Sequence, residues 1–407
     1  MKWIFIVMSV VALLVTVWGL KASPKIELPK DCDFDECVEF IMNNSAIPGL
    51  AVAKLVSGEI ELVKTYGYAN LESGQKVDEN TLFHVASVSK PIMGISLLQL
   101  IDEGLIDLDE DINKYLSFQV KNPNFEDEII TLRHLASHTS GIKDNYDPNS
   151  FTANIDPNTT LKEHVSSLLS KSGAQYSEGF YYSRNKPGTT REYSNLAAAL
   201  AGQLVESVTD TSLADYSKSH LLEPLILNQT VWMVADIVHK SVATPYEVVT
   251  CIPFIPVCAN TENPTFNSFI YKNFSPSKEH TSFVPYPHWG NPQYPDGGIR
   301  SSISDLANLM RFIIKNEKAN GEQLLSNAAY EEMFSNQVDP NISGGQRFFW
   351  RDNSMGLAGH MGADLGAFTA FYFSPESGNG FIILMNRGAD TRGGVAMKQL
   401  AKMLTKD

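Results

Sequence analysis

The sequence lacks the features by which several large classes of protein are identified. It contains no run of basic residues, no internal repeat and no low-complexity tract. Its 46 acidic and 32 basic side chains give the 407 residues a net charge of −14. Such an acidic chain is poorly suited to nucleic acid and offers no basic patch to a membrane. The composition is that of a globular protein long enough to bury a large core.

Cysteine is also scarce, and the four residues form two close pairs, Cys32 with Cys37 and Cys251 with Cys258. In an oxidising compartment two local disulfides are the natural pairing, although sequence alone leaves other connectivities open. Zinc binding is the competing interpretation, and it is weak because neither pair has Cys-x-x-Cys spacing or an adjacent histidine. In a host that glycosylates, sequons begin at Asn43, Asn158, Asn228, Asn273 and Asn341.

The N-terminal segment is expected to be a targeting sequence and not part of the fold. Residues 3–20 are mostly apolar and are followed by Lys21-Ala22-Ser23. This pattern is typical of a secretory signal peptide (residues 1–22) with cleavage near Ala22. The run is also just long enough to remain as an uncleaved membrane anchor. Both alternatives predict a secreted or extracytoplasmic protein.

Strand patterns lie toward both ends of the chain, and helical patterns lie between them. Residues 50–56 and 59–68 flank Ser57-Gly58 and predict a hairpin, and residues 366–373 and 380–385 predict two later strands. Further helices are predicted at 31–43, 161–170, 196–205, 304–315 and 395–404.

The economical arrangement is a single domain over residues 30–407. One sheet is built from both chain ends, about 30–75 and 296–407, with a largely helical insert at about 76–295. Within the insert, residues 144–160 are predicted to be a surface excursion. Residues 231–292 are predicted to form a long loop region that walls or covers a pocket.

The strongest chemical signal is Ser87-x-x-Lys90, at the point where a short apolar run enters a predicted amphipathic helix. Residues three apart lie on one helix face, so an amine stands beside a hydroxyl that is a weak nucleophile on its own. The spacing recurs at Ser73, Ser140, Ser183 and Ser275. Those four lie in loops or turns and are interpreted as solvated, whereas only Ser87 opens a long helix.

Two further elements add candidate site residues. Tyr193-x-Asn195 precedes an alanine-rich helix, where a tyrosine hydroxyl beside a lysine can relay a proton. Asn195 could position Lys90 or donate to a substrate amide. His360-x-Gly362, followed by Ala363, begins a strand whose glycines allow the backbone to approach a ligand closely. Structural roles, a helix cap and a packed histidine, are the alternative interpretations.

Taken in order and with their spacing, these elements resemble the serine β-lactamase-like family. That family includes class C β-lactamases, penicillin-binding peptidases, D-aminopeptidases and related esterases. The resemblance covers roughly residue 47 to the C-terminus. It implies an α+β fold with an antiparallel sheet flanked by helices and a separate helical subdomain.

The resemblance also implies a role for each site residue. Ser87 would be acylated, Lys90 would act as general base, and Tyr193 would shuttle the proton of the leaving group. Asn195, His360 and Gly362 would contact substrate. The backbone N–H groups of Ser87 and Ala363 would form the oxyanion hole.

One departure bears on the substrate. Penicillin-binding members carry a lysine where this chain has His360, and an imidazole of ordinary pKa, about 6.5, is mostly neutral at pH 7. We therefore expect a serine hydrolase acting on a small-molecule or peptide ester or amide, without metal or organic cofactor. The alternatives are a true β-lactamase or D-Ala-D-Ala carboxypeptidase, and a non-catalytic binding or assembly-forming member of the fold.

Overall fold

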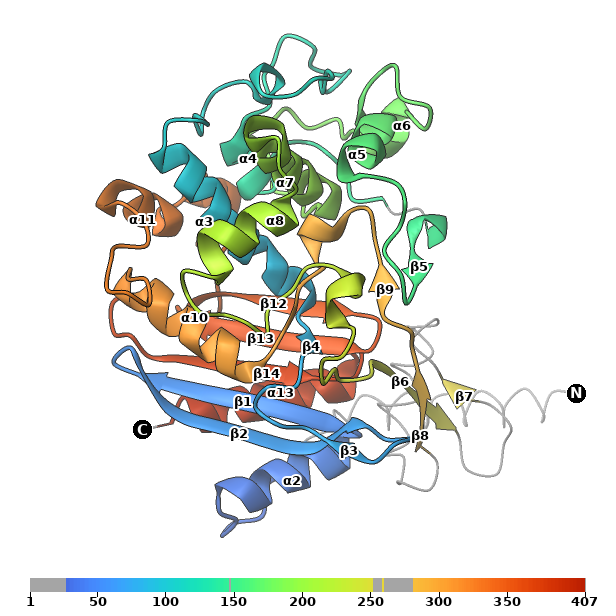
Figure 1. The fold of residues 1–407 in the computed structure, drawn as a ribbon, viewed down its shortest axis with the longest axis vertical. Coiled ribbons are helices and arrows are strands. Elements are labelled where there is room, and N and C mark those ends of the chain that lie inside the picture. Colours follow the sequence, from blue (N-terminus) through green and yellow to red (C-terminus); the bar gives the residue numbers. More distant parts are fainter. Residues whose placement is uncertain (1–26, 146–147, 252–257, 260–280, 407) are drawn as a thin grey trace, which may run out of the picture.

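The computed structural model describes residues 27–145, 148–251, 258–259 and 281–406 (Figure 1). The segment predicted as signal peptide or anchor, residues 1–22, lies outside these ranges. The main sheet of the described chain is antiparallel, in the order β11-β12-β13-β14-β1-β2-β3. Its strands are β1 (Gly49–Val56), β2 (Glu59–Asn70), β3 (Gln75–Lys76), β11 (Arg351–Asp352), β12 (Ala358–Asp364), β13 (Ala367–Phe373) and β14 (Gly380–Met385).

The pairing of β14 with β1 joins the two ends of the chain, which confirms the predicted sheet architecture. The turn between β1 and β2 has positive φ at both Ser57 (52°) and Gly58 (77°). Positive φ at both central residues gives a two-residue turn the twist that antiparallel strands need. The predicted hairpin therefore forms where the sequence placed it.

Alternate residues of the central strands face two different hydrophobic layers. Leu50 and Val52 pack toward α2 (Phe34–Ser45) and α13 (Thr391–Leu404), while Ala51 and its alternate neighbours face the main core. In Figure 1, α2 lies below the sheet and α13 overlaps the sheet strands. A slip of one residue in the pairing would exchange the two faces, so burial fixes this register.

The remaining helices form a layer above the sheet, and α3 runs through it. The helices are α3 (Ser89–Asp102), α4 (Leu132–Ala136), α5 (Leu161–Leu169), α6 (Glu178–Tyr181), α7 (Asn195–Thr209), α8 (Leu213–Ser217), α10 (Ile303–Lys315), α11 (Asn327–Phe334) and α12 (Pro340–Ser343). In Figure 1, α4, α5, α7 and α8 lie above the sheet. Shorter helical turns are η1 (Ala86–Val88), η2 (Ile112–Lys114), η3 (Pro148–Ser150), η4 (Lys218–Leu222), η5 (Val234–Ile237) and η7 (Tyr294–Asp296).

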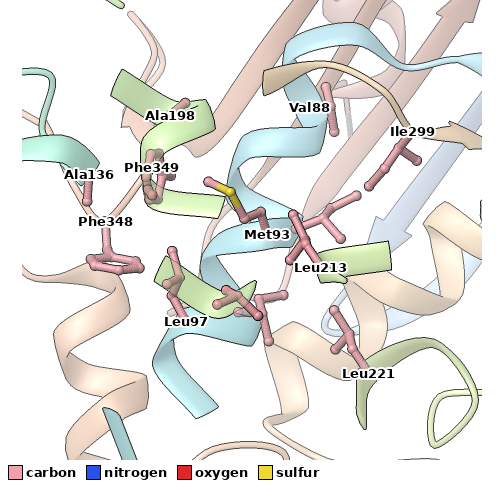
Figure 2. Close-up of a cluster of buried hydrophobic side chains, with 14 of the residues drawn as sticks. Val88, Met93, Leu97, Ala136, Ala198, Leu213, Leu221, Ile299, Phe348 and Phe349 are labelled. Atoms are coloured by element: carbon pink, nitrogen blue, oxygen red, sulfur yellow. The ribbon is translucent and has the colours of Figure 1, made fainter. Parts of the chain in front are cut away.

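Helix α3 is the centre of this layer. Figure 2 shows Met93 and Leu97 of α3 among side chains from α4, α7, α8 and the Phe348-Phe349 segment. The prediction of an amphipathic helix is wrong here, because 11 of the 14 residues of α3 are buried. A helix that is buried on all sides is held by packing around its whole circumference. The first turn of α3, which carries Lys90, is therefore held rigidly by this packing.

The region 231–292, predicted as loop, contains strands in its described part. The strands β6 (Tyr246–Cys251), β7 (Cys258–Ala259) and β8 (Thr281–Pro285) form a small antiparallel sheet. Two short pairs connect distant segments: β5 (Thr152–Ala153) with β9 (Trp289–Gly290), and β4 (Phe83–His84) with β10 (Arg300–Ser301).

The predicted disulfide between Cys32 and Cys37 is present, with 5.4 Å between the Cα atoms. Cys251 and Cys258 lie opposite each other in the paired strands β6 and β7. Their side chains lie outside the described part of the structure, so that disulfide stays a prediction. Asn273, one of the sequons, is also outside it. Among the residues described, no helix has the length and apolar character needed to cross a membrane.

Candidate active site

Ser87 occupies a strained turn between β4 and α3. It lies in the helical turn η1, one turn earlier than the regular helix, and the preceding Ala86 has φ of +49°. A non-glycine residue rarely adopts this conformation, and such strain persists only where neighbouring structure imposes it. Here the N–H of Val85 donates to the carbonyl of Ile299 at 3.0 Å, and β4 pairs with β10. The turn is thereby held with the Ser87 side chain partly exposed.

The side chains of Lys90 and Tyr193 both meet the Ser87 hydroxyl. Lys90 Nζ donates to Ser87 Oγ at 3.0 Å, and Tyr193 OH donates to the same oxygen at 2.9 Å. Lys90 Nζ also donates to the carbonyl of Asp296 at 2.5 Å, and the lysine side chain is fully buried. The three groups thus form the nucleophile-and-base arrangement that covalent catalysis requires.

The other Ser-x-x-Lys sequences within the described residues do not bring lysine to serine. Lys143 Nζ, three residues after Ser140, donates to the carbonyl of Gly179 at 2.7 Å. The remaining two lysines engage other groups: Lys186 forms an ion pair with Glu128, and Lys76 lies over the Tyr68 ring. Ser275 lies outside the described ranges. The Ser-x-x-Lys spacing alone therefore does not bring lysine to serine. The contact forms at Ser87 because Lys90 lies in the buried first turn of α3.

Tyr193 is positioned by a neutral histidine. The rings of His138 and Tyr193 lie 4.4 Å apart, and the N–H of Ser194 donates to His138 Nδ1 at 3.3 Å. Burial, and then the positive charges of Arg191 and Lys90, hold the pKa of His138 well below its usual value. The ring is therefore neutral and can accept this hydrogen bond at pH 7.

Asn195 contacts a residue that the sequence did not indicate. Its backbone N–H and its Nδ2 donate to the two carboxylate oxygens of Asp144, at 3.0 and 2.8 Å. Asp144 was predicted to begin a surface excursion, and that prediction is wrong for this residue, which is partly buried beside the site. Burial raises the pKa of Asp144, although the Asn195 N–H lowers it. A hydrogen bond from Asn195 to Lys90 is not formed among the described residues.

Strand β12 lies directly against the backbone that precedes Ser87. A Cβ atom added at Gly362 would lie 2.1 Å from the carbonyl oxygen of Val85 and 2.3 Å from Thr369 Oγ1. Thr369 Oγ1 donates to that same carbonyl at 2.9 Å. Glycine is therefore required for the close approach. Ala363 follows it in β12, and the role of its N–H beside that of Ser87 stays a prediction.

His360 lies on β12 with its ring centroid 6.3 Å from that of Tyr193. Its Nδ1 is 2.6 Å from the carbonyl oxygen of Met361. Burial, and then the positive charge of Lys90, lower the pKa of His360 to about 3. The histidine is thus neutral at pH 7 and supplies no fixed cation. Across the residues the structure describes, no group of three or more His, Cys, Asp or Glu side chains is placed to hold a metal ion.

Comparison with known proteins matches nearly the whole chain to one protein family. The beta-lactamase family model matches residues 34–403. A protein named flp from Staphylococcus aureus is 24% identical over 357 residues, which are 88% of this chain and 63% of that protein. A beta-lactamase of Yersinia enterocolitica is 27% identical over 207 residues, 51% of this chain and 48% of that one. The chain thus spans less than two thirds of the length of the curated relatives it matches.

Two solved structures show the shared fold. An octameric penicillin-binding protein homologue from Pyrococcus abyssi superposes with a TM-score of 0.68 and 24% identity, covering 92% of this chain and 77% of that one. The D-amino acid amidase of Ochrobactrum anthropi, solved with D-phenylalanine, gives a TM-score of 0.65 and 19% identity, covering 91% and 98%. At these identities the likeness shows the architecture.

Proposed function

Because the chain belongs to the beta-lactamase family, we propose that it is a serine hydrolase that cleaves an ester or amide through an acyl-enzyme on Ser87. The observation that carries the proposal is the pair of hydrogen bonds that Lys90 and Tyr193 make to one hydroxyl, at 3.0 and 2.9 Å. A serine hydroxyl is weakly nucleophilic until a neighbouring base removes its proton. Here two candidate bases are already within hydrogen-bonding reach.

In the proposed reaction, Ser87 Oγ attacks the substrate carbonyl carbon while its proton moves to Lys90 in its neutral amine form or to Tyr193 in its phenolate form, and the two groups exchange that proton. Tyr193 then gives a proton to the leaving oxygen or nitrogen as the carbonyl reforms and the acyl-enzyme is left. A water molecule attacks the acyl group, loses its proton to the same pair, and Ser87 is released with its proton. Each transfer of this kind contributes roughly 10²–10⁴-fold to rate.

The oxyanion of each tetrahedral intermediate needs donors. We assign them to the backbone N–H groups of Ser87 and Ala363, because Gly362 lets β12 lie against the segment preceding Ser87. Losing one such donor costs roughly 2.7–4 kcal/mol of transition-state stabilisation. Asn195, held by Asp144, is proposed to contact the substrate, together with His360 and Gly362.

The proposal extends to organisation and location. Residues 30–407 would form one domain, with sheet parts at about 30–75 and 296–407 and a helical insert at about 76–295. The Cys32–Cys37 disulfide suits an oxidising, extracytoplasmic compartment. The substrate would be a small-molecule or peptide ester or amide.

The test is hydrolysis of a chromogenic short-chain ester and of a chromogenic cephalosporin by wild type, Ser87→Ala and Ser73→Ala. Ser73 begins another Ser-x-x-Lys sequence but is exposed in a turn, so it is a matched control. We expect ester turnover that Ser87→Ala abolishes and Ser73→Ala preserves. Rapid cephalosporin turnover would instead identify a β-lactamase. No turnover of either substrate by wild type would favour a binding protein.

A further inference from the structure

The Arg191 guanidinium lies beside the proposed site and has no acidic partner among the described residues. Its Cζ lies 6.0 Å from the centroid of the Tyr193 ring, and the side chain is partly buried. Its Nε donates to Oε1 of Gln346 at 2.7 Å, which is a neutral amide. Among the described residues neither of its Nη atoms has a hydrogen-bond partner, and no carboxylate forms an ion pair with it.

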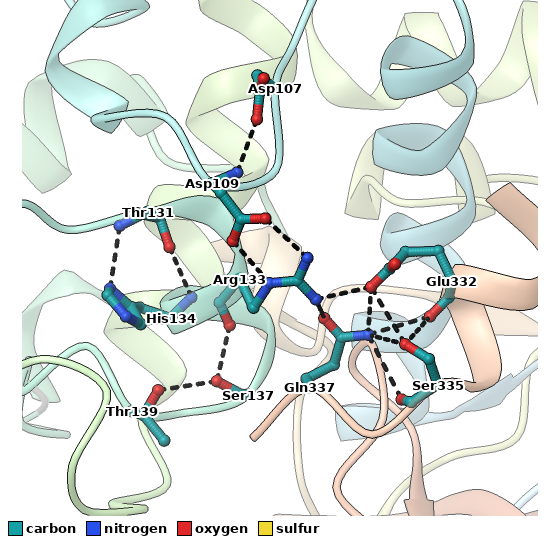
Figure 3. A network of polar contacts seen from close by, with 10 residues as sticks. All are labelled: Asp107, Asp109, Thr131, Arg133, His134, Ser137, Thr139, Glu332, Ser335 and Gln337. Atoms are coloured by element: carbon teal, nitrogen blue, oxygen red, sulfur yellow. Dashed lines mark hydrogen bonds and ion pairs between the residues drawn. The ribbon is translucent and has the colours of Figure 1, made fainter. Parts of the chain in front are cut away.

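Three other arginines of the described chain that are partly or fully buried form ion pairs with carboxylates. Figure 3 shows Arg133, whose Nε and Nη2 donate to the two oxygens of Asp109 at 2.6 and 2.8 Å. Its Nη1 donates to Glu332 at 2.7 Å. Arg347 and Arg387 likewise form ion pairs with nearby aspartates. A charge removed from water is costly unless it is paired, so the unpartnered Nη groups of Arg191 are suited to an external anion.

The surroundings of Arg191 add positive charge. Burial, and then the positive charge of Arg351, lower the pKa of Arg191 to about 10, so the group is still protonated at pH 7. Arg351 lies on β11 opposite Gly359, and Gly359 immediately precedes His360 in the sequence. Arg351 forms no ion pair within the described chain. Lys90 Nζ lies 5.1 Å from the centroid of the same Tyr193 ring. The nearby acid Asp144 already receives two hydrogen bonds from Asn195.

The position of Arg191 identifies the part of the substrate it would meet. In the proposed reaction Tyr193 protonates the leaving group, so groups beside Tyr193 face that portion of the substrate. We propose that Arg191, assisted by Arg351, binds a carboxylate on the leaving-group side of the substrate. A guanidinium presents parallel N–H donors that match the two oxygens of a carboxylate. Anion recognition would then come from this side of the site, although His360 is neutral.

This inference rests on the proposed function, and a matched pair of esters tests it. The substrates are the acetyl esters of 4-nitrophenol and of 3-carboxy-4-nitrophenol, which differ by one carboxylate on the leaving group. We expect wild type to prefer the carboxylate ester. Arg191→Gln should lower the ratio of kcat/KM, carboxylate over neutral, about tenfold or more, as expected for one charge-assisted hydrogen bond. Arg191→Lys, which keeps the charge, should recover part of the ratio.

Arg184→Gln is the matched control, because Arg184 is exposed and has no ion pair in the described chain. It should change the ratio by less than about twofold, the effect of a distant surface charge. If Arg191→Gln lowered kcat/KM by the same factor for both esters, the inference would be overturned and Arg191 would only support Tyr193. So would a wild-type enzyme without preference.

Binding to Ser87→Ala separates this inference from the proposed hydrolase. Calorimetric dissociation constants for both esters are measured with Ser87→Ala and with the Ser87→Ala, Arg191→Gln double variant. An Arg191-dependent preference for the carboxylate ester, without turnover by wild type, would support the anion site and reject the hydrolase. Turnover without such a preference would support the hydrolase and overturn the anion site. Absence of binding would also overturn the anion site.

Discussion

Two polar regions meet at helix α4, and they differ in whether their charged side chains form ion pairs. Around Arg133, on α4, each of the three guanidinium nitrogens donates to an acceptor, and Gln337 completes the network with Glu332 (Figure 3). Just beyond α4, His138 supports Tyr193, and there Lys90 and Arg191 form no ion pairs within the described residues. The contrast separates charges that hold elements together from charges available to a substrate.

The difference teaches how the same residue types serve stability or chemistry. Removing a charge from the Arg133 network leaves partners unpaired and should cost folding free energy. Removing one from the Ser87 region should cost activity and little stability. Each of the four predictions below tests that division.

The largest effect is expected from Lys90→Met. Ester hydrolysis should fall roughly 10²–10⁴-fold, the usual contribution of a positioned base. The midpoint of thermal unfolding should not fall, because the variant replaces a fully buried amine with an apolar side chain of similar length. Lys76→Met, exposed and also part of a Ser-x-x-Lys sequence, is the control. Retained activity together with a large loss of stability would contradict the separation between charges that stabilise the fold and charges that serve the reaction.

The second effect concerns Arg133→Met, which leaves Asp109, Glu332 and Gln337 without their shared donor. The free energy of unfolding in urea should fall by roughly 1–3 kcal/mol, the cost of unpaired, partly buried groups. Ester hydrolysis should stay within about twofold of wild type, since a substitution away from the site does not touch the reacting groups. Arg184→Met, at an exposed position, should leave both quantities unchanged. An activity loss larger than the stability loss would place Arg133 with the site instead.

The pH dependence of that stability difference is the third prediction. The hydrogen bond from Arg133 lowers the pKa of Asp109. Burial raises the pKa of Glu332, but hydrogen bonds from Gln337 and Arg133 leave it below its usual value. A depressed folded-state pKa adds stability above the unfolded value, near about 4, and this is lost as pH falls through the folded value.

The urea concentration at the midpoint of unfolding should therefore differ between wild type and Arg133→Met by a constant amount from pH 7 to 5. This difference should become smaller below about pH 4. Measuring both proteins at each pH cancels contributions from groups they share. A gap that widens on acidification would mean that these carboxylates do not depend on Arg133.

The smallest effect is expected from His360→Gln. Because burial and Lys90 lower the pKa of His360 to about 3, the ring does not titrate between pH 5 and 8. The acidic limb of the kcat/KM profile over that range should keep its midpoint, whatever the change in absolute rate. A midpoint displaced by about one pH unit would show that His360 carries charge during turnover, since one unit reflects about 1.4 kcal/mol of changed interaction.

Local signals made much of the fold predictable. Ser57-Gly58 between two apolar stretches indicated a hairpin, and both residues adopt the positive φ that such a turn requires. The contact between Ser87 and Lys90 followed from helical spacing, since both residues lie within one turn. By contrast, β6 and β8 pair across a proline-rich stretch whose composition favours loops, and only their hydrogen bonds to each other explain the sheet.

Contacts between distant segments could not be predicted from one sequence. Asp144 lies in a polar stretch whose composition predicts a solvated loop. It nevertheless accepts a hydrogen bond from Asn195, which is 51 residues away in the sequence. Arg191 looks like any other arginine, and only its neighbour Gln346, 155 residues away, shows that its Nε is held by a neutral partner. Whether a polar side chain is paired depends on how distant segments pack, and a single sequence carries no local sign of it.

Acylation of Ser87 is the most direct test of the central claim. Wild type is mixed with a slowly released chromogenic ester, quenched in acid within milliseconds, and analysed by intact mass and peptide mapping. We expect one acyl group on the peptide containing Ser87, retained in Ser73→Ala and absent in Ser87→Ala. Turnover without any adduct on Ser87, or an adduct on another residue, would contradict the account.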